Sequence, residues 1–174
     1  NGEIYNYKEI RKELEKRYKF KSKSDTEVIL RAYEAYGPTC VSKFNGMFAF
    51  AIWDVKKDLL VLARDRVGIK PLYYYHNEQR FMFASEIKAF LADKNIPRRI
   101  NHQAVAEYLT FQNIMDEKTF FEGVKMLLPG HYILLQGGKV SLHKYWDASY
   151  LKKDLGNVQA YYDNFRSIFS DAVT

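Results

Sequence analysis

The chain has 174 residues, of which 47% are hydrophobic, 16% aromatic and 28% charged, a composition typical of a globular domain and not of a disordered chain. No apolar run is long enough to span a bilayer, so a membrane role is not expected. The net charge is +6, but acids and bases alternate in the most basic stretch, residues 7–23, so the sequence argues against a nucleic-acid partner.

The first quarter of the chain carries two helical patterns. Ile10, Leu14 and Tyr18 recur at helical spacing and predict a helix over residues 6–18. Ser24, with Glu27 three positions later, has the form of a capping box and predicts the start of a second helix. The sequence Gly-Pro at 37–38 ends it.

The middle and the last third of the chain carry strand patterns. Residues 46–54 are almost continuously apolar, which predicts a strand covered on both faces. Further strands are expected at 59–64, 72–76 and 80–85, and a hairpin over 130–146 that turns at Gln-Gly-Gly-Lys.

Three more segments have helical character, namely residues 85–93, 101–111 and 158–174. The order of elements is therefore a helix pair, a strand cluster, a second helix pair, a hairpin and a helix. This order predicts a layered α+β domain with antiparallel sheets and not a βαβ array.

Most residue types that carry chemistry give no site here. The four histidines are scattered without metal-ligand spacing, so no metal site is predicted. Cys40, the single cysteine, cannot form an internal disulfide; it fits a reducing, cytoplasmic setting and is best interpreted as a small buried residue. Arg64 and Asp65 are interpreted as a structural ion pair at a strand end.

The first residues are a stronger candidate. Asn1 offers a side-chain N–H, and Gly2 lets its backbone N–H approach a ligand closely, so the two together suit a developing oxyanion. Glu3 and Asp25 are carboxylates that suit a ligand ammonium group. The residues alone leave another interpretation open, in which Asn-Gly is a tight turn and Asp25 merely favours a helix N-terminus.

Six blocks match a known family in order. They are NGEIYNY (1–7), SDTEVIL (24–30), FNGMFAFAIWD (44–54), RDRVGIKPLYY (64–74), ASEIKAF (84–90) and LPGHYILLQGGKVSLHKYWD (128–147). Together they resemble the N-terminal glutaminase domain of glutamine-hydrolysing asparagine synthetases, a class II glutamine amidotransferase domain.

This resemblance implies an Ntn-hydrolase-type αββα sandwich, in which two antiparallel sheets lie between helix layers. It also implies L-glutamine as substrate, attacked by an N-terminal cysteine. By position, Asn1 and Gly2 match the oxyanion hole, and Glu3 and Asp25 match the residues that bind the glutamine α-amino group. Ammonia then passes to a C-terminal synthetase domain that uses ATP and Mg to amidate aspartate, and bacterial members are commonly homodimers.

The chain departs from the family pattern at both ends. The nucleophilic cysteine and an arginine for the glutamine carboxylate lie upstream of NGEIYN in the family, so the sandwich is expected to be incomplete at the N-terminus, with open sheet edges that favour association. Residues 1–150 are expected to form the glutaminase domain, and residues 151–174 a linker and the first helix of the synthetase domain. No cofactor is expected within 1–174, and the chain alone is expected to be inactive.

Two other functions stay open at this point. The parent protein could amidate another carboxylate, such as a sugar acid or a peptide, because a shared donor site does not fix the acceptor. The domain could also be a non-catalytic scaffold that stabilises a neighbour, although the presence together of Asn1, Gly2, Glu3 and Asp25 argues against that.

Overall fold

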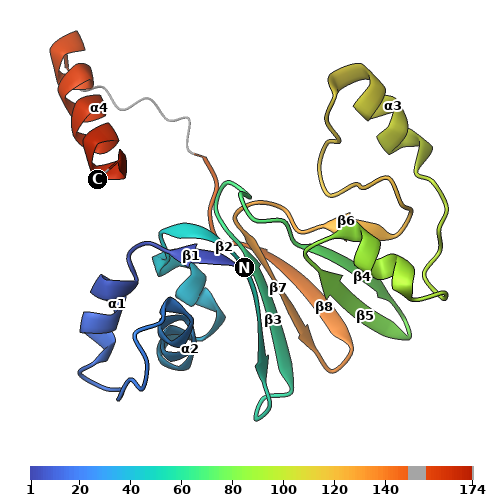
Figure 1. Cartoon of the computed structure of the whole chain (residues 1–174), viewed down its shortest axis with the longest axis horizontal. Coiled ribbons are helices and arrows are strands. Elements are labelled where there is room, and N and C mark those ends of the chain that lie inside the picture. The colour runs from blue at the N-terminus through green and yellow to red at the C-terminus, as the bar shows by residue number, and fades with distance from the viewer. Residues whose placement is uncertain (149–155, 174) are drawn as a thin grey trace.

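Two antiparallel sheets pack against each other at the centre of the computed structural model, which describes residues 1–148 and 156–173 (Figure 1). The larger sheet has the order β1 (Gly2–Ile4), β2 (Gly46–Asp54), β3 (Leu59–Arg64), β7 (His131–Gln136), β8 (Lys139–Lys144). The smaller sheet has the order β5 (Arg80–Ala84), β4 (Tyr73–Asn77), β6 (Val124–Met126). The six strands predicted between residue 46 and the hairpin's end, of which β7 and β8 form the hairpin, are confirmed within two residues. The strands β1 and β6, of three residues each, were not predicted.

The strand β2 shows how the sequence builds the sandwich. Phe48 and Ile52 point to one face, into a core shared with the helices, and Ala49 points to the other face, toward the smaller sheet. The expectation that β2 is covered on both faces is correct only for its first half, because Ala51 and Trp53 are exposed. Only three strands face the five-stranded sheet, and they leave this end of β2 uncovered.

The helices α1 (Tyr7–Leu14) and α2 (Asp25–Tyr36) cover the outer face of the larger sheet (Figure 1). Ile10 and Leu14 of α1 and Val28 of α2 are buried in the core that contains Phe48. The first helix is shorter than predicted, because residues 15–17 are all charged and add nothing to the apolar stripe.

The start of α2 differs from a capping box in one respect. Ser24 caps the helix by accepting a hydrogen bond from Thr26 N at 3.1 Å. Glu27, however, does not bond back to Ser24; its carboxylate accepts hydrogen bonds from Lys21 N and Ser22 N, at 2.8 and 2.6 Å. The carboxylate therefore fastens the incoming loop and not the cap. Gly37 ends α2 with a positive φ of 65° and donates to Tyr33 O, as the Gly-Pro signal predicted.

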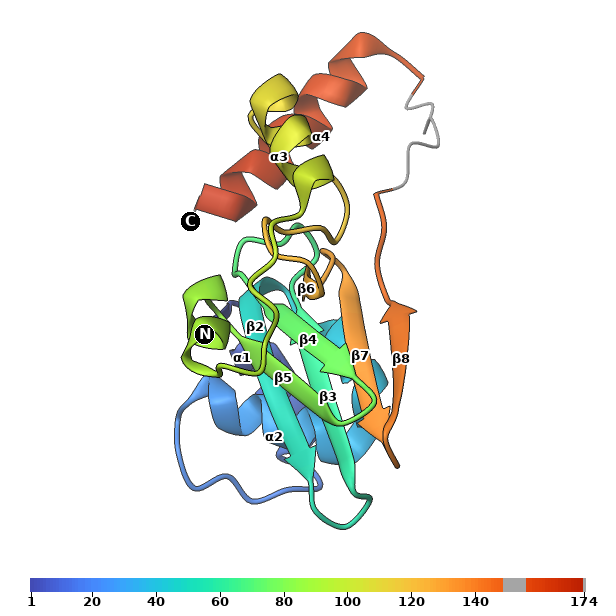
Figure 2. The same cartoon turned by 90° about the vertical axis from the view of Figure 1, so that its right-hand side faces the viewer.

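A short helical segment packs against the other side of the smaller sheet, and the longer helix that follows it lies beyond the end of that sheet (Figure 2). Residues predicted as a helix at 85–93 form a 3₁₀-helix, η2 (Ile87–Ala92), whose Phe90 packs with Tyr75 and Val124 of that sheet. The helix α3 (His102–Phe111) starts at Asn101, whose side chain accepts from Ala104 N at 3.2 Å. The layers therefore follow the predicted helix–sheet–sheet–helix order of an αββα sandwich, an α+β fold.

The helix α4 (Val158–Val173) falls where the last helical pattern was predicted. None of its residues is buried. The expected domain boundary between residues 150 and 151 lies outside the described residues, so the division stays a prediction. Within the described part of the chain, no helix is long and apolar enough to cross a membrane.

Candidate functional site

The first residues form an edge strand and not the tight turn that Asn-Gly can favour. Strand β1 pairs antiparallel with the start of β2, with Gly2 opposite Phe48 and Glu3 opposite Met47. Ala49 N donates to Asn1 O at 2.9 Å, and the Asn1 amino group donates to Ala49 O at 3.1 Å. The turn interpretation is therefore wrong, because pairing with β2 holds this segment extended.

The register fixes the direction of the Gly2 N–H. In an antiparallel pair, residues alternate between positions whose backbone groups bond to the partner strand and positions whose groups point away from it. Asn1 and Tyr5 bond to β2, through Ala49 and Asn45 O, so Gly2 and Ile4 lie at the alternate positions. The N–H of Gly2 therefore points away from β2, toward the open edge of the sheet.

Glycine is required at residue 2 for two reasons. Its φ is +116°, a conformation that residues with a side chain rarely adopt, and a Cβ there would overlap the carbonyl oxygen of Met47. A Cβ at Gly46, across the ladder, would likewise overlap the carbonyl oxygen of Glu3. The two strands thus approach each other through glycines on both sides.

Asp25 comes to the same edge from the first residue of α2. Its Oδ2 accepts a hydrogen bond from Ile4 N at 3.1 Å, and Ile4 N–H points to the same side of β1 as Gly2 N–H. The side chain therefore does more than favour a helix N-terminus: it ties α2 to β1.

A cavity of about 330 Å³ joins these residues. Its walls include Gly2, Glu3 and Asp25, together with Tyr7, Lys23 and Ser24. A smaller cavity of about 100 Å³ lies beside it and adds Asn1 to Gly2, Glu3 and Asp25. The structure thus brings all four sequence-predicted residues to one edge, although they come from β1 and from the start of α2.

Lys23 is a lining residue that the sequence reasoning missed. It lines the same cavity as Glu3 and Asp25, so residues of both charge signs surround that cavity. A lone lysine in a stretch as rich in lysine as residues 16–23 gives no signal of its own. Only the fold distinguishes it from its neighbours.

The carboxylate of Asp65 holds the part of β2 that pairs with the site residue Gly2. It is fully buried and accepts hydrogen bonds from Phe48 N at 3.3 Å and from Ile69 N and Lys70 N at 2.9 and 3.0 Å. Asp65 N in turn donates to Phe48 O at 2.8 Å. Because Phe48 is the register partner of Gly2, Asp65 helps to hold in place the part of β2 that pairs with Gly2.

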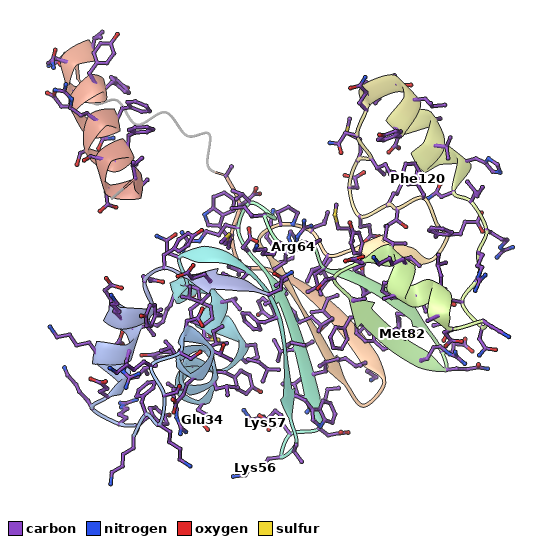
Figure 3. The ribbon with its side chains drawn as sticks, viewed as in Figure 1. Glu34, Lys56, Lys57, Arg64, Met82 and Phe120 are labelled. Carbon is purple, nitrogen blue, oxygen red and sulfur yellow. The ribbon has the colours of Figure 1, made fainter. Side chains whose placement is uncertain are left out.

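Arg64 does not form the ion pair with Asp65 that the sequence suggested. Its guanidinium donates to the carbonyl oxygens of Lys70, Leu127 and Gly68, at 2.8, 2.6 and 2.7 Å (Figure 3). Both residues therefore hold the loop at 66–70: Asp65 accepts hydrogen bonds from its N–H groups, and Arg64 donates to two of its carbonyls and joins it to Leu127.

Cys40 lies away from this edge, in the 3₁₀-helix η1 (Gly37–Lys43), and is buried. Burial raises the pKa of its thiol to about 12, so the thiol stays protonated and is a poor nucleophile. The interpretation of Cys40 as a buried core residue is confirmed. Across residues 1–148 and 156–173, no three His, Cys, Asp or Glu side chains are grouped as a metal site.

The family model for the glutamine amidotransferase domain matches residues 1–146. The chain belongs to the glutamine amidotransferase domain family. Asparagine synthetase [glutamine-hydrolyzing] 3 of Bacillus subtilis is 39% identical over 176 residues, which cover 100% of this chain and 28% of that protein. Amidase chry2 of Gibberella zeae is 35% identical over 181 residues, covering 99% of this chain and 26% of that protein.

Solved structures confirm the fold of this amidotransferase domain. The glutamine phosphoribosylpyrophosphate amidotransferase from B. subtilis, solved with ADP and GMP, superposes with a TM-score of 0.59 at 18% identity, covering 85% of this chain and 28% of that chain. This neighbour has the Ntn-hydrolase fold, so the predicted fold class is confirmed. The chain spans about a quarter of the length of these curated relatives.

Proposed function

We propose that this amidotransferase domain binds L-glutamine at the edge formed by β1 and the start of α2. The α-ammonium group lies between the carboxylates of Glu3 and Asp25. The side-chain carbonyl faces the backbone N–H of Gly2 and the side-chain amide of Asn1. The observation that carries this proposal is that the Gly2 N–H and the Asp25 carboxylate face the same open edge and line the same cavity.

The chemistry of amide hydrolysis suits this arrangement. Attack on the glutamine side-chain amide turns its carbonyl into a tetrahedral oxyanion, and donors already aimed at that oxygen lower the barrier. Gly2 N–H is such a donor, because the β1–β2 ladder does not use it. The four site residues are therefore assigned to binding and oxyanion stabilisation, and none of them is a nucleophile.

We further propose that the attacking cysteine is not part of this chain. Cys40 is the only cysteine in the sequence, and its thiol is buried with a raised pKa. Incubation of the chain with L-glutamine should therefore release no glutamate. Glutamate release that disappears in a Cys40→Ala variant would overturn this assignment.

For the parent protein, we propose that ammonia from glutamine passes to an ATP- and Mg-dependent synthetase domain that amidates aspartate in the cytoplasm. The support is the similarity to asparagine synthetases, which is 39% and 41% identity to two proteins of B. subtilis. Residues 151–174, with α4, would then lead into that synthetase domain, and the parent would form a homodimer.

A second candidate keeps the glutamine site and changes the acceptor. Amidases of Gibberella zeae and Penicillium rubens match this chain at 35% and 37% identity. A parent protein that amidates a sugar acid or a peptide carboxylate therefore remains the alternative, and a scaffold that binds no glutamine is the third.

Titration of the ¹⁵N-labelled chain with L-glutamine, followed by amide NMR, tests the site. The amides of Gly2 and Ile4 should shift, and 4-carbamoylbutyrate, which lacks the α-amino group, should shift Ile4 much less. Asp25→Asn should weaken binding, whereas Glu34→Gln, a carboxamide change on the exposed side of α2, should not. Shifts confined to residues away from β1, or none at all, would refute the site and favour the scaffold.

A further inference from the structure

Tyr145, the first residue after strand β8, is joined by hydrogen bonds to two places in the core. Its hydroxyl donates to the carbonyl oxygen of Arg64 at 2.8 Å, and its backbone N–H donates to Gly130 O at 2.9 Å. The N–H of Gly130 donates in turn to Asp65 O at 2.8 Å. Because Arg64 and Asp65 are consecutive, these three hydrogen bonds close a ring. The ring fixes the carbonyl groups on both sides of Asp65.

This hydrogen-bonded ring is buried and tightly packed. Arg64 and Asp65 are both buried, and so is Gly130. Gly130 has a φ of +67°, and a Cβ there would lie 2.5 Å from the carbonyl oxygen of Trp146, so the chain after β8 crosses directly over this glycine. Burial raises the pKa of the Tyr145 phenol, so its hydroxyl keeps its proton near neutral pH. The ring therefore has a defined geometry and a permanent donor.

Asp65 connects the ring to the edge that carries the proposed glutamine site. Its backbone N–H donates to Phe48 O at 2.8 Å, and its Oδ2 accepts from Phe48 N at 3.3 Å. Phe48 lies opposite Gly2, and a Cβ on Gly2 would lie only 2.9 Å from Phe48 Cα. The two backbones are therefore in close contact, with no side chain between them. Because packed backbones and hydrogen-bonded networks carry displacements, a shift of Asp65 moves the strand against which Gly2 lies.

We propose that Tyr145 is a positioning residue of the glutamine site, where it fixes the direction of the Gly2 N–H. It acts through Asp65 and Phe48. The inference rests on the proposed function, in which the Gly2 N–H faces the side-chain carbonyl of glutamine. Tyr145 lines neither of the two cavities at that edge, so its effect on binding passes through other residues. Hydrogen bonds weaken when the donor is misaligned, so a change in the direction of this N–H lowers its contribution.

The variant Tyr145→Phe removes the hydroxyl and keeps the ring of the side chain. Tyr33→Phe is the matched control, because the Tyr33 hydroxyl also makes a hydrogen bond of 2.8 Å, to Asp54 Oδ2. Asp54 is the last residue of β2, whereas Phe48 lies near its start. Both variants thus lose one hydroxyl hydrogen bond of equal length, and only one of these bonds belongs to the ring.

Amide NMR of the two variants without ligand gives the first test. In Tyr145→Phe, the amides of Asp65, Phe48 and Gly2 should all shift, because the ring that holds Asp65 has lost one of its bonds. In Tyr33→Phe, the amide of Gly2 should stay in place. An unshifted Gly2 amide in Tyr145→Phe would overturn the proposal. A shifted Gly2 with Asp65 and Phe48 unshifted would also overturn it, because the effect would then take another route.

Comparison of two ligands gives the second test and separates positioning from a general loosening of the domain. L-Norvaline has the α-ammonium and carboxylate groups of L-glutamine, but its side chain has no carbonyl for the Gly2 N–H. In Tyr145→Phe the Kd of L-glutamine should rise about two- to tenfold, the range for losing part or all of one neutral hydrogen bond. The Kd of L-norvaline should not change, and Tyr33→Phe should change neither value.

The outcomes also separate this inference from the proposed function. Equal weakening of both ligands in Tyr145→Phe would show a merely structural role and would overturn the inference. Unchanged binding of L-glutamine would overturn it too, and in both cases the glutamine site itself stands. If the unmodified chain binds no L-glutamine, the proposed function and this inference are refuted together.

Discussion

The substitution Gly2→Ala tests the close approach of β1 and β2 most directly. A Cβ at this position would overlap the carbonyl oxygen of Met47 and would lie 2.8 Å from its carbonyl carbon and 2.9 Å from Phe48 Cα. All three atoms belong to the backbone of β2, so no side chain can rotate away. Relief therefore requires β1 to move or to change its φ of +116°.

The expected loss of stability follows from two costs. Holding a residue with a side chain at an unfavourable φ costs about 1–3 kcal/mol. Pushing packed elements apart costs about 1–3 kcal/mol more, as in overpacked cores. The free energy of unfolding should therefore fall by about 2–6 kcal/mol unless β1 detaches, and the melting temperature by roughly 2–4 °C for each of these kcal/mol.

Gly37→Ala is the matched control. Gly37 also has a positive φ, 65°, but a Cβ there would meet no atom within 4 Å. Urea denaturation of both variants, followed by circular dichroism, measures the difference. The control should lose only about 1–2 kcal/mol, the cost of the backbone conformation. A Gly2→Ala variant no less stable than the control, with the amides of Glu3 and Ala49 unshifted, would refute the close approach.

Three further predictions concern buried or hydrogen-bonded groups. Asp65→Asn should lower the free energy of unfolding in urea by about 2–4 kcal/mol, because its amide group would face the N–H groups of Phe48 and Lys70; an unchanged midpoint would contradict this. Hydrogen bonds, the largest from Ser22, lower the pKa of Glu27 from 4.5 to about 2, so its stabilising effect is present above pH 4.5 and is lost as the pH falls through 2. The ¹³C carboxyl shift should titrate near pH 2, and Glu27→Gln should flatten the stability profile in this window. Cys40 should not react with a thiol reagent at pH 8 until the chain unfolds, since burial raises its pKa to about 12; fast labelling of the folded chain would show that the thiol is accessible.

The long elements could be predicted from the sequence because their own residues determine them. The run at 46–54 and its partner at 59–64 became β2 and β3 with no change of bounds. The short strand β1 could not be predicted, because three residues carry no periodicity and Asn-Gly favours a turn when considered alone. Pairing with β2 decides its conformation, and that contact joins residues more than 40 positions apart.

Some residues of the candidate site could likewise be predicted from the sequence, and others could not. Asn1, Gly2, Glu3 and Asp25 were found from residue type and family resemblance, and the structure gathers them around adjoining cavities. Lys23 and Asp65 were missed in their present roles. A lysine among lysines has no distinguishing pattern, and Asp65 beside Arg64 resembles an ion pair until the hydrogen bonds are known. Both roles depend on where the fold directs a side chain.

The backbone N–H groups along β1 alternate in direction, so adjacent N–H groups have different roles. The Glu3 amide faces β2 and holds the strand, whereas the Gly2 amide faces the cavity and is not part of the ladder. Replacement of the Asn1–Gly2 amide by an ester would therefore delete one hydrogen-bond donor of the site while the sheet keeps all of its bonds. The same replacement one linkage later would cost the sheet a bond and leave that donor intact. A semisynthetic protein could thus remove the proposed oxyanion donor without altering any side chain.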